Sequence, residues 1–300
     1  MKTLKITLVL CLFVTLAFAD VTPKEKDALL SIYNATDGKN WTNSWDVNAP
    51  VETWYGVKIK NEKVVGLNLS FNNLNGALPE QIGDLKNLRY LVLFKNNIAG
   101  TIPQNIGKLS QLRTLNIAFN KLEGELPNSI GQLQSLAKLE LFMNRIHGSL
   151  PSTIGNLTNL KKLELYNNEL SGNVPAEIGN LSELKEIYLS SNRLSGRIPS
   201  TIKNLKNLEI LSLFDNKFIG ELPLSLSGLS KLRELILSDN LFYGYVPIEL
   251  ARLSNLKVLL LNNNNLKGDF AALQKALPQV IQFEYMNKKV TNRSTLANTD

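Results

Sequence analysis

The chain has 300 residues, a formal net charge of +7 and a single cysteine. Its basic residues are spread along the sequence without a dense Lys/Arg run, which argues against nucleic-acid binding. With no pair of cysteines, the core must hold by packing and hydrogen bonds alone.

Residues 1–19 have the features of an export signal. Lys2 and Lys5 give a positive start, residues 6–18 form a nearly unbroken apolar run, and residues 17–19 read Ala-Phe-Ala, a pattern that signal peptidases cut after. The run is too short for a membrane span, and no later segment is apolar enough for one. We therefore expect a cleaved signal peptide and a secreted, extracellular protein, periplasmic or at the cell surface if the source is bacterial, with no stable membrane insertion.

Residues 20–63 are predicted to form an N-terminal cap. Residues 22–25, Thr-Pro-Lys-Glu, read as a capping box with Pro at the first helical position, and they open an amphipathic helix. Trp41, Trp45 and Trp54 follow, and we interpret them as a small aromatic core that seals the stack, not as a sugar-binding platform. Apolar residues on both sides of Asn61 and Glu62 predict a β-hairpin leading into the next segment.

From residue 64 onward an apolar residue begins a new unit every 24 residues, nine times without an insertion or deletion. Each unit follows the pattern LxxLxLxxNxLxG, and eight of the nine continue with a Pro three residues after the Gly. A fixed period in this range predicts a solenoid in which each unit packs only on its neighbours. The L-x-L alternation places leucines on the inner face of a short strand, so residues 64–269 should form a curved superhelix with a parallel concave sheet.

One asparagine recurs in every unit where the chain leaves the strand. We expect its buried amide to satisfy backbone groups that no sheet reaches, and the loss of one such residue to cost about 1–3 kcal/mol. The Gly and Pro that follow are expected to allow tight bends on the outer side. This structural ladder comprises Asn72, Asn96, Asn120, Asn144, Asn168, Asn192, Asn216, Asn240 and Asn264.

The L-x-G-x-I/L/V-P-x-x-I-G stretch resembles the plant-specific class of leucine-rich repeat, over residues 24–270. That class occurs in receptor-kinase ectodomains and in secreted polygalacturonase-inhibiting proteins, and similar cysteine-free chains occur in some bacteria and algae. The resemblance implies an α/β-type, mostly β solenoid that binds a protein or polysaccharide on its concave face. Residues 54–57 resemble the W-x-G-V element of the family's cap. Glu52 and Ile59 replace the cysteines that flank it in the plant proteins, so the capping disulfide is absent.

Residues 270–292 are predicted to form a degenerate C-terminal cap. Asp269 begins a short helix that ends before Pro278. Val280, Phe283 and Tyr285 keep the phase of the repeat and predict a tenth strand. Residues 293–300 are expected to be a flexible tail.

The residues between the strand leucines face solvent and include aromatic and basic side chains in neighbouring units. Contiguous exposed aromatics usually mark an interaction site, and aromatics with Arg dominate binding hot spots. The alternative is that these rings merely pack on one another. Charge is uneven along this face, basic in units two to five and acidic in units six to eight, which would orient a partner. The candidate ligand contacts are Tyr90, Phe94, Arg113, Phe119, Lys138, Phe142, Lys162, Tyr166, Tyr188 and Phe214.

The sequence does not indicate catalysis. His147 is the only histidine, and the chain contains no motif for a nucleophile, a metal or a phosphate loop. Asp215 and Asp239 share a column, but charged columns in such a fold are normally solvated. We predict a non-catalytic recognition module without a cofactor or metal, monomeric or weakly oligomeric. A structural or adhesive spacer is the alternative. Ice binding would need a regular Thr or Asn array, and the mixed outer column of residues 77 to 197 argues against it.

Overall fold

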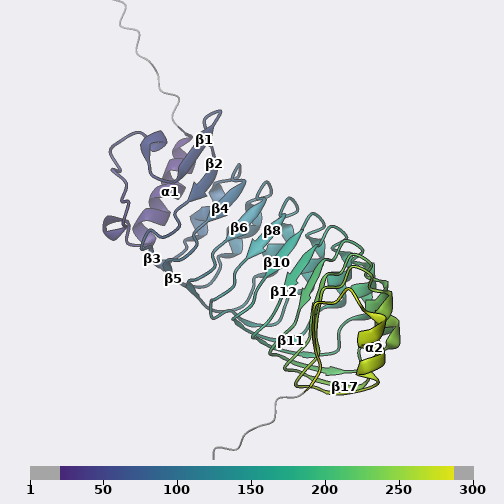
Figure 1. Ribbon diagram of the computed structural model, residues 1–300. Helices are drawn as coiled ribbons and strands as arrows, with labels where there is room; N and C mark the ends of the chain where they lie inside the picture. The colour runs from purple at the N-terminus through teal and green to yellow at the C-terminus, as the bar shows by residue number, and fades with distance from the viewer. Residues whose placement is uncertain (1–20, 287–300) are drawn as a thin grey trace, which may run out of the picture.

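The computed structural model describes residues 21–286, which form a curved solenoid with an α-helix at each end (Figure 1). The predicted signal peptide and flexible tail lie outside the described residues. The first helix begins at a capping residue, Thr22, and the second at Asp269, as the sequence predicts. Within residues 21–286, no helix combines the length and apolar character that crossing a membrane requires. The two α-helices are α1 (Pro23–Ala35) and α2 (Phe270–Ala276).

An 11-stranded sheet lines the concave side, with one strand from each repeat. Its strands pair in parallel, except that β1 and β2 form the predicted antiparallel hairpin. The tenth strand predicted near the C-terminus is present, since Phe283 of β20 lies opposite Leu259 of β18. In sheet order the strands are β1 (Val57–Lys60), β2 (Lys63–Asn68), β4 (Tyr90–Val92), β6 (Thr114–Asn116), β8 (Lys138–Glu140), β10 (Lys162–Glu164), β12 (Glu186–Tyr188), β14 (Ile210–Ser212), β16 (Glu234–Ile236), β18 (Val258–Leu260) and β20 (Gln282–Glu284).

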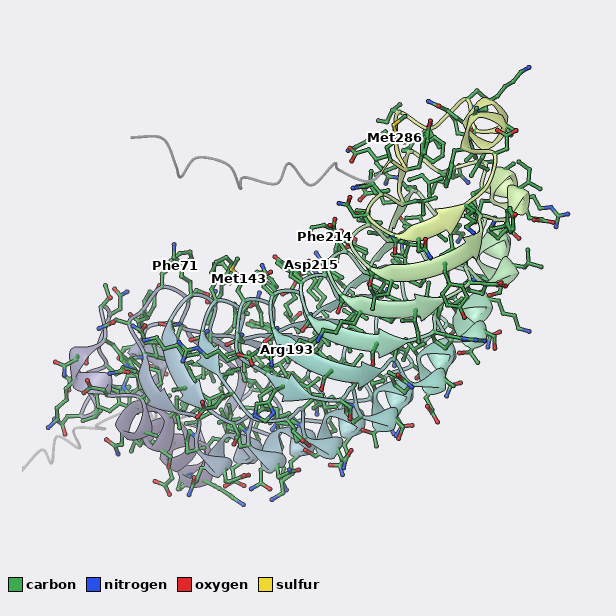
Figure 2. All side chains as sticks on the ribbon, turned by 90° about the horizontal axis from the view of Figure 1, so that it is seen from below. Phe71, Met143, Arg193, Phe214, Asp215 and Met286 are labelled. Atoms are coloured by element: carbon green, nitrogen blue, oxygen red, sulfur yellow. The ribbon has the colours of Figure 1, made fainter. Side chains whose placement is uncertain are left out.

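The segments predicted as tight bends around the Gly column form additional strands instead. Gly172, for example, has φ 73° and pairs with Leu194 of the next repeat. Glycine adopts this φ without strain, so the segment stays extended enough to bond with its stacked neighbours. Figure 2 looks onto these side sheets, with Arg193 on the six-stranded one. The three-stranded side sheet contains β3 (Asn75–Ala77), β5 (Asn97–Gly100) and β7 (Lys121–Leu122), and the six-stranded one contains β9 (His147–Gly148), β11 (Glu169–Asn173), β13 (Arg193–Gly196), β15 (Lys217–Gly220), β17 (Leu241–Tyr245) and β19 (Asn265–Lys267).

The Pro column begins a short 3-10 helix in each of repeats 1 to 8, on the outer side of the curve (Figure 2). Pro127, with φ −67°, directly precedes one of them, because its fixed φ suits a helix start and its missing N–H needs no partner there. Two further 3-10 helices lie in the N-terminal cap. The two helices of the cap are η1 (Gly38–Asn40) and η2 (Val51–Thr53). Those of the repeats are η3 (Glu80–Asp84), η4 (Gln104–Lys108), η5 (Asn128–Gln132), η6 (Ser152–Asn156), η7 (Ala176–Asn180), η8 (Ser200–Asn204), η9 (Leu224–Gly228) and η10 (Ile248–Arg252).

The asparagine ladder joins consecutive repeats from within. The Asn168 amide nitrogen donates to the carbonyl oxygens of Leu141 and Leu165, each at 3.0 Å, and its Oδ1 accepts from the Ile146 N–H at 3.0 Å. The same pattern repeats through the stack to Asn264. In repeat 1, Asn72 instead accepts from the N–H of Asn43 in the N-terminal cap at 2.6 Å.

The N-terminal cap seals the stack with an aromatic core. Trp45 and Trp54 stack at 4.6 Å between ring centroids, and all three tryptophans are buried. The capping box differs from the prediction in one respect. The buried carboxylate of Glu25 accepts from the N–H of Val64 at 3.4 Å, so it ties helix α1 to strand β2.

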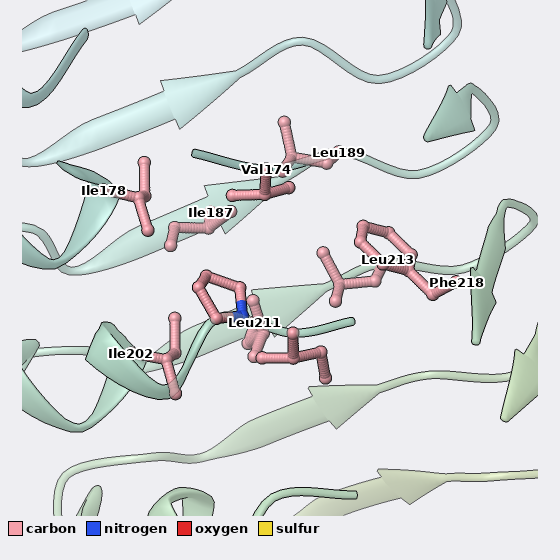
Figure 3. A pocket seen from close by; sticks show the side chains of 10 residues that line it. Val174, Ile178, Ile187, Leu189, Ile202, Leu211, Leu213 and Phe218 are labelled. Carbon is pink, nitrogen blue, oxygen red and sulfur yellow. The ribbon is translucent and has the colours of Figure 1, made fainter. Parts of the chain in front are cut away.

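A small apolar void remains in the core near the middle of the stack (Figure 3). Its volume is about 20 Å³, and its lining includes Val174, Ile187, Leu211 and Phe218. At the position of Val174, each of the other repeats from 1 to 7 carries the larger Leu or Ile.

Candidate ligand-binding surface

Six aromatic side chains from six consecutive repeats meet ring to ring along the concave side. The centroid distances between successive rings are 5.3, 5.3, 5.5, 4.4 and 6.5 Å. Most neighbouring rings meet edge to face, and one pair, Phe142 and Tyr166, is stacked. We name this row the aromatic ladder, and it consists of Phe71, Phe94, Phe119, Phe142, Tyr166 and Tyr188.

Two of these rings come from a backbone position that is unfavourable for large side chains. Phe71, Phe119 and Met143 precede the ladder asparagines and have φ of 55°, 54° and 55°. This left-handed conformation costs about 1–2 kcal/mol for most L-residues, and Asn and Asp tolerate it best. Repeats 5, 7, 8 and 9 do use such residues, Asn167, Asp215, Asp239 and Asn263, and repeat 6 uses the small Ser191. Repeats 1, 3 and 4 therefore carry bulky apolar groups where the backbone favours short polar ones, whereas repeat 2 carries Lys95. Phe71 and Met143 lie on the inner side of the curve (Figure 2).

A polar cluster adjoins the C-terminal end of the aromatic ladder. Lys162 forms ion pairs with Glu164 at 3.1 Å and with Glu186 at 3.3 Å, and its ammonium lies 5.9 Å from the centre of the Tyr188 ring. Burial, together with the charges of Glu140 and Glu186, raises the pKa of Glu164 despite the hydrogen bond and the charge of Lys162. Burial alone would lower the pKa of Lys162, but the hydrogen bonds and charges of Glu164 and Glu186 leave it raised. Burial, followed by the charges of Glu186 and Glu234, raises the pKa of Tyr188 to about 12.

The structure joins five of the ten predicted contact residues in one row of rings, and Lys162 adjoins the end of that row. Phe94, Phe119, Phe142, Tyr166 and Tyr188 belong to the aromatic ladder. Among the described residues, no ring contact joins Phe214 to the aromatic ladder, because Ser190 occupies the place between Tyr166 and Phe214 in their column. The Tyr90 ring lies over Gly66, on the neighbouring strand. Lys162 is held in ion pairs, whereas Arg113 and Lys138 are exposed.

The predicted contact set omits Phe71, which ends the aromatic ladder on the N-terminal side. Its ring lies 5.3 Å from that of Phe94 and the same distance from the Lys95 ammonium, and it is 59% exposed. The signal was present in the sequence, since Phe71 shares a column with Phe119. What the sequence could not show is that this column turns its side chains toward the neighbouring column of rings.

No arrangement for metal chemistry is present within residues 21–286. No three His, Cys, Asp or Glu side chains there come close enough to hold an ion. Asp239 is engaged by the Asn263 amide at 2.8 Å. The groups that this surface offers to a ligand are aromatic rings, a few charges and hydrogen-bonding side chains.

Two models of leucine-rich repeats match the chain. A leucine-rich repeat region model matches residues 63–197, and a leucine-rich repeat model matches residues 182–242. The chain is a leucine-rich repeat protein of the plant type. The matched ranges include all six residues of the aromatic ladder and exclude the N-terminal cap up to residue 62.

Two of the proteins similar to this leucine-rich repeat protein come from Arabidopsis thaliana. The Leucine-rich repeat protein FLOR 1 of Arabidopsis thaliana is 37% identical over 82 residues, which is 27% of this chain and 25% of that protein. The ectodomain of the Arabidopsis thaliana receptor kinase GASSHO1/SCHENGEN3, solved in complex with Casparian strip integrity factor 2, is 33% identical with a TM-score of 0.63. That match covers 71% of this chain and 28% of the ectodomain.

A plant ice-binding protein matches over a larger share. Its structure is 29% identical, with a TM-score of 0.77, and the match covers 89% of this chain and 87% of that protein. This leucine-rich repeat protein thus spans about a quarter of FLOR 1 and of the receptor ectodomain, but nearly the whole of the ice-binding protein.

Proposed function

We propose that this protein is a non-catalytic, extracellular recognition module that binds a protein ligand across the aromatic ladder. The observation that carries the proposal is the placement of Phe71, Phe119 and Met143 in left-handed backbone conformations, where they are partly exposed. Unfavourable conformations persist where function requires them. Neither the repeat fold nor its backbone requires bulky apolar side chains at these places, so their display on the surface needs a reason such as ligand contact.

The dimensions and ring orientations favour a protein segment as the ligand. The aromatic ladder crosses six strands, or roughly 24 Å at the usual strand spacing, which suits about seven residues of an extended chain. A polysaccharide would stack on flat, parallel ring faces. Most neighbouring rings here stand edge to face, with interplanar angles of 68°, 75° and 82°. The spaces between such rings suit branched apolar side chains better than they suit sugar rings.

Charges beside the aromatic ladder would orient the ligand. Arg113 and Lys138 are exposed on or beside neighbouring strands, and the face becomes acidic toward Asp215 and Asp239. Such asymmetry selects one direction of binding and speeds association more than it tightens the complex. The similar ectodomain of GASSHO1/SCHENGEN3 supports a protein ligand, since it was solved with one bound.

Two other functions compete with this proposal. A structural spacer would leave the aromatic ladder without a ligand, its rings merely packing on one another. Ice binding is favoured by the similarity to a plant ice-binding protein. The exposed outer column opposes it, because Ala77, Thr101, Glu125, Ser149 and Asn173 offer no repeating group.

The experiment compares wild-type protein with the triple variant Phe71→Asn, Phe119→Asn, Met143→Asn. Each substitution removes ring or thioether surface and relieves the left-handed strain, so each should leave the free energy of unfolding within about 1 kcal/mol of wild type. The control is Ser191→Asn, which alters the same left-handed column in repeat 6 without changing a ring or a charge. Ligands are captured from extracellular fluid of the source organism, and a polysaccharide panel and thermal hysteresis are measured in parallel.

We expect wild type and control to retain a protein ligand, and the triple variant to bind it at least about a hundredfold more weakly while melting at a similar temperature. Equal retention by all three proteins would show that the ring row is internal packing and would favour the spacer. Thermal hysteresis in the absence of a protein ligand would move ice binding ahead.

A further inference from the structure

A second apolar surface lies on the side sheet of repeats 7 and 8, on a different face from the aromatic ladder. Strand pairing puts Ile219 of β15 opposite Leu241 of β17, so the apolar groups adjoin across the strands. The other members lie on β17 and at the first residues of η9 and η10. We name this surface the side patch, and its exposed side chains are Ile219 (44%), Leu224 (61%), Leu241 (57%), Tyr243 (42%), Tyr245 (74%) and Ile248 (53%).

The same columns in the first six repeats are polar or small. The repeat architecture therefore does not demand apolar groups at these places, and repeats 7 and 8 depart from it together. An apolar cluster confined to two adjacent repeats of a regular stack marks an interaction site. The column of Tyr245 reads Ala77, Thr101, Glu125, Ser149, Asn173 and Arg197, and the column of Leu224 and Ile248 reads Glu80, Gln104, Asn128, Ser152, Ala176 and Ser200.

The strands under the side patch are supported from within by two stacked rings. Phe218 and Phe242 lie 6.1 Å apart between centroids with an interplanar angle of 5°, and both are fully buried. The earlier repeats carry Leu or Ile in this column. Because the aromatic pair fills the space between β15, β17 and the core, the patch sits on a rigid platform, which lowers the entropy cost of binding.

An open hollow of about 660 Å³ adjoins the side patch. Leu224 and Tyr243 contribute to its lining, together with Arg197 and Glu221, which carry opposite charges. Tyr245, the most exposed member of the patch, follows Tyr243 by two residues on the same strand, so both side chains stand on the same face. One face thus carries a projecting ring and, beside it, a hollow large enough to receive one.

We propose that the side patch is a self-association surface, covered by a second copy of this chain. In this dimer Tyr245 of each copy enters the hollow of the other. A projection and a hollow on one face satisfy the condition for a two-fold contact, in which the same surface is used on both sides. The charges fit as well, because the entering tyrosine hydroxyl can donate to Glu221, and Arg197 of one copy can pair with Glu221 of the other.

The exposed area agrees with a dimer. Six side chains of this size, each about half exposed, offer on the order of 500 Å² of apolar surface, which is the size of the largest apolar patch on a typical monomer, and such patches often serve an interaction. A standard interface takes roughly 800 Å² from each partner, with a polar rim around an apolar centre. Arg197, Lys217, Glu221 and Lys267 border the side patch and would form that rim.

The test measures the mass of the purified protein by sedimentation equilibrium over a wide concentration range. Wild type should pass from one copy to two. Tyr245→Ala removes the projection and Leu224→Asp places a charge in the hollow, so each should weaken the dimer at least about thirtyfold. The matched controls lie in the same columns of repeat 5, Asn173→Ala and Ala176→Asp, and should dimerise as wild type does. Circular dichroism confirms that all variants are folded.

A mixture of the two weakened variants tests the two-fold geometry itself. In a pair made of one copy of each, the intact Tyr245 of one chain can still enter the intact hollow of the other. The mixture should therefore contain more dimer than either variant alone. A monomeric wild type, an undiminished dimer in both variants, open-ended polymers, or a mixture no more dimeric than its components would each overturn the proposal.

This inference is independent of the proposed ligand. The triple variant of Phe71, Phe119 and Met143 should dimerise as wild type does, because those residues lie in repeats 1, 3 and 4. Loss of ligand binding and loss of the dimer can thus be told apart.

Discussion

At the scale of single residues, two columns of the repeat have opposite tasks. The asparagine column satisfies the interior, since each side chain bridges backbone groups of two repeats. The column directly before it places side chains of varied chemistry on the surface. Its backbone is in the left-handed conformation, which only some residues adopt easily. Phe119 and Asn120 are adjacent examples: one is 37% exposed with φ 54°, and the other accepts from the Ile98 N–H.

Replacing one ladder asparagine should test the interior role. Asn168→Ala leaves the carbonyls of Leu141 and Leu165 and the N–H of Ile146 without their partner, so we expect the free energy of unfolding to fall by about 2–3 kcal/mol. Asn159→Ala is the control, because its exposed amide makes one hydrogen bond, to Gln134. Urea denaturation measures both variants. An equal, small loss in both would mean that water replaces the ladder bonds without cost.

At the scale of elements, the void in the middle of the stack shows how closely each repeat must match its neighbours. Val174→Leu restores the side-chain size found at this place in most other repeats and fills the void of about 20 Å³. At the usual cost of cavity volume this should raise the free energy of unfolding by roughly 0.5 kcal/mol. Val246→Leu, in the same column of repeat 8, does not line this void and serves as the control. A lower midpoint temperature of thermal unfolding for Val174→Leu than for wild type would show that the void is too narrow for the added methylene.

Most elements could be predicted because their signals are local and periodic. The leucine spacing predicted the concave strands. Thr22 and Asp269 predicted where the two helices begin, and Asn61-Glu62 predicted the hairpin. The side sheets could not be predicted so directly, since a Gly followed by a Pro suggests a bend and the strand character comes from stacking on the next repeat. The same limit applies to the surfaces. The concave rings follow from the L-x-L register, but the link through Phe71, the break at Ser190 and the side patch depend on how columns meet in space.

At the scale of the whole molecule, the aromatic ladder and the side patch lie on different faces of the stack and in different repeats. The aromatic ladder belongs to the concave side of repeats 1 to 6, and the side patch to another face of repeats 7 and 8. The leucine core between them is continuous, so both faces are held by the same nearest-neighbour packing. A dimer through the side patch would leave both aromatic ladders uncovered, and two copies of a recognition surface in one assembly increase avidity for a multivalent ligand.

The stability of the whole stack should depend on pH in the alkaline range through the cluster at the end of the aromatic ladder. The pKa of Tyr188 is raised to about 12 by burial and then by the charges of Glu186 and Glu234, from an ordinary value of 10.0. The folded state therefore holds this proton more tightly than the unfolded chain does. Its stabilising effect is complete below pH 10 and is lost as the pH rises to about 12. The raised pKa of Lys162 acts in the same direction.

The variant Tyr188→Phe should lose less stability than wild type over that range, because it carries no phenol to ionise. Chemical denaturation at about pH 9 and about pH 11.5 gives the difference for each protein. Ultraviolet titration at a wavelength of tyrosinate absorption provides a second measurement, in which wild type should show one late-ionising group that the variant lacks. Tyr243→Phe is the control, since that ring lies in the side patch and is 42% exposed. Equal losses in wild type and Tyr188→Phe would mean that solvent reaches the Tyr188 hydroxyl freely, and that the concave surface is open at this end of the aromatic ladder.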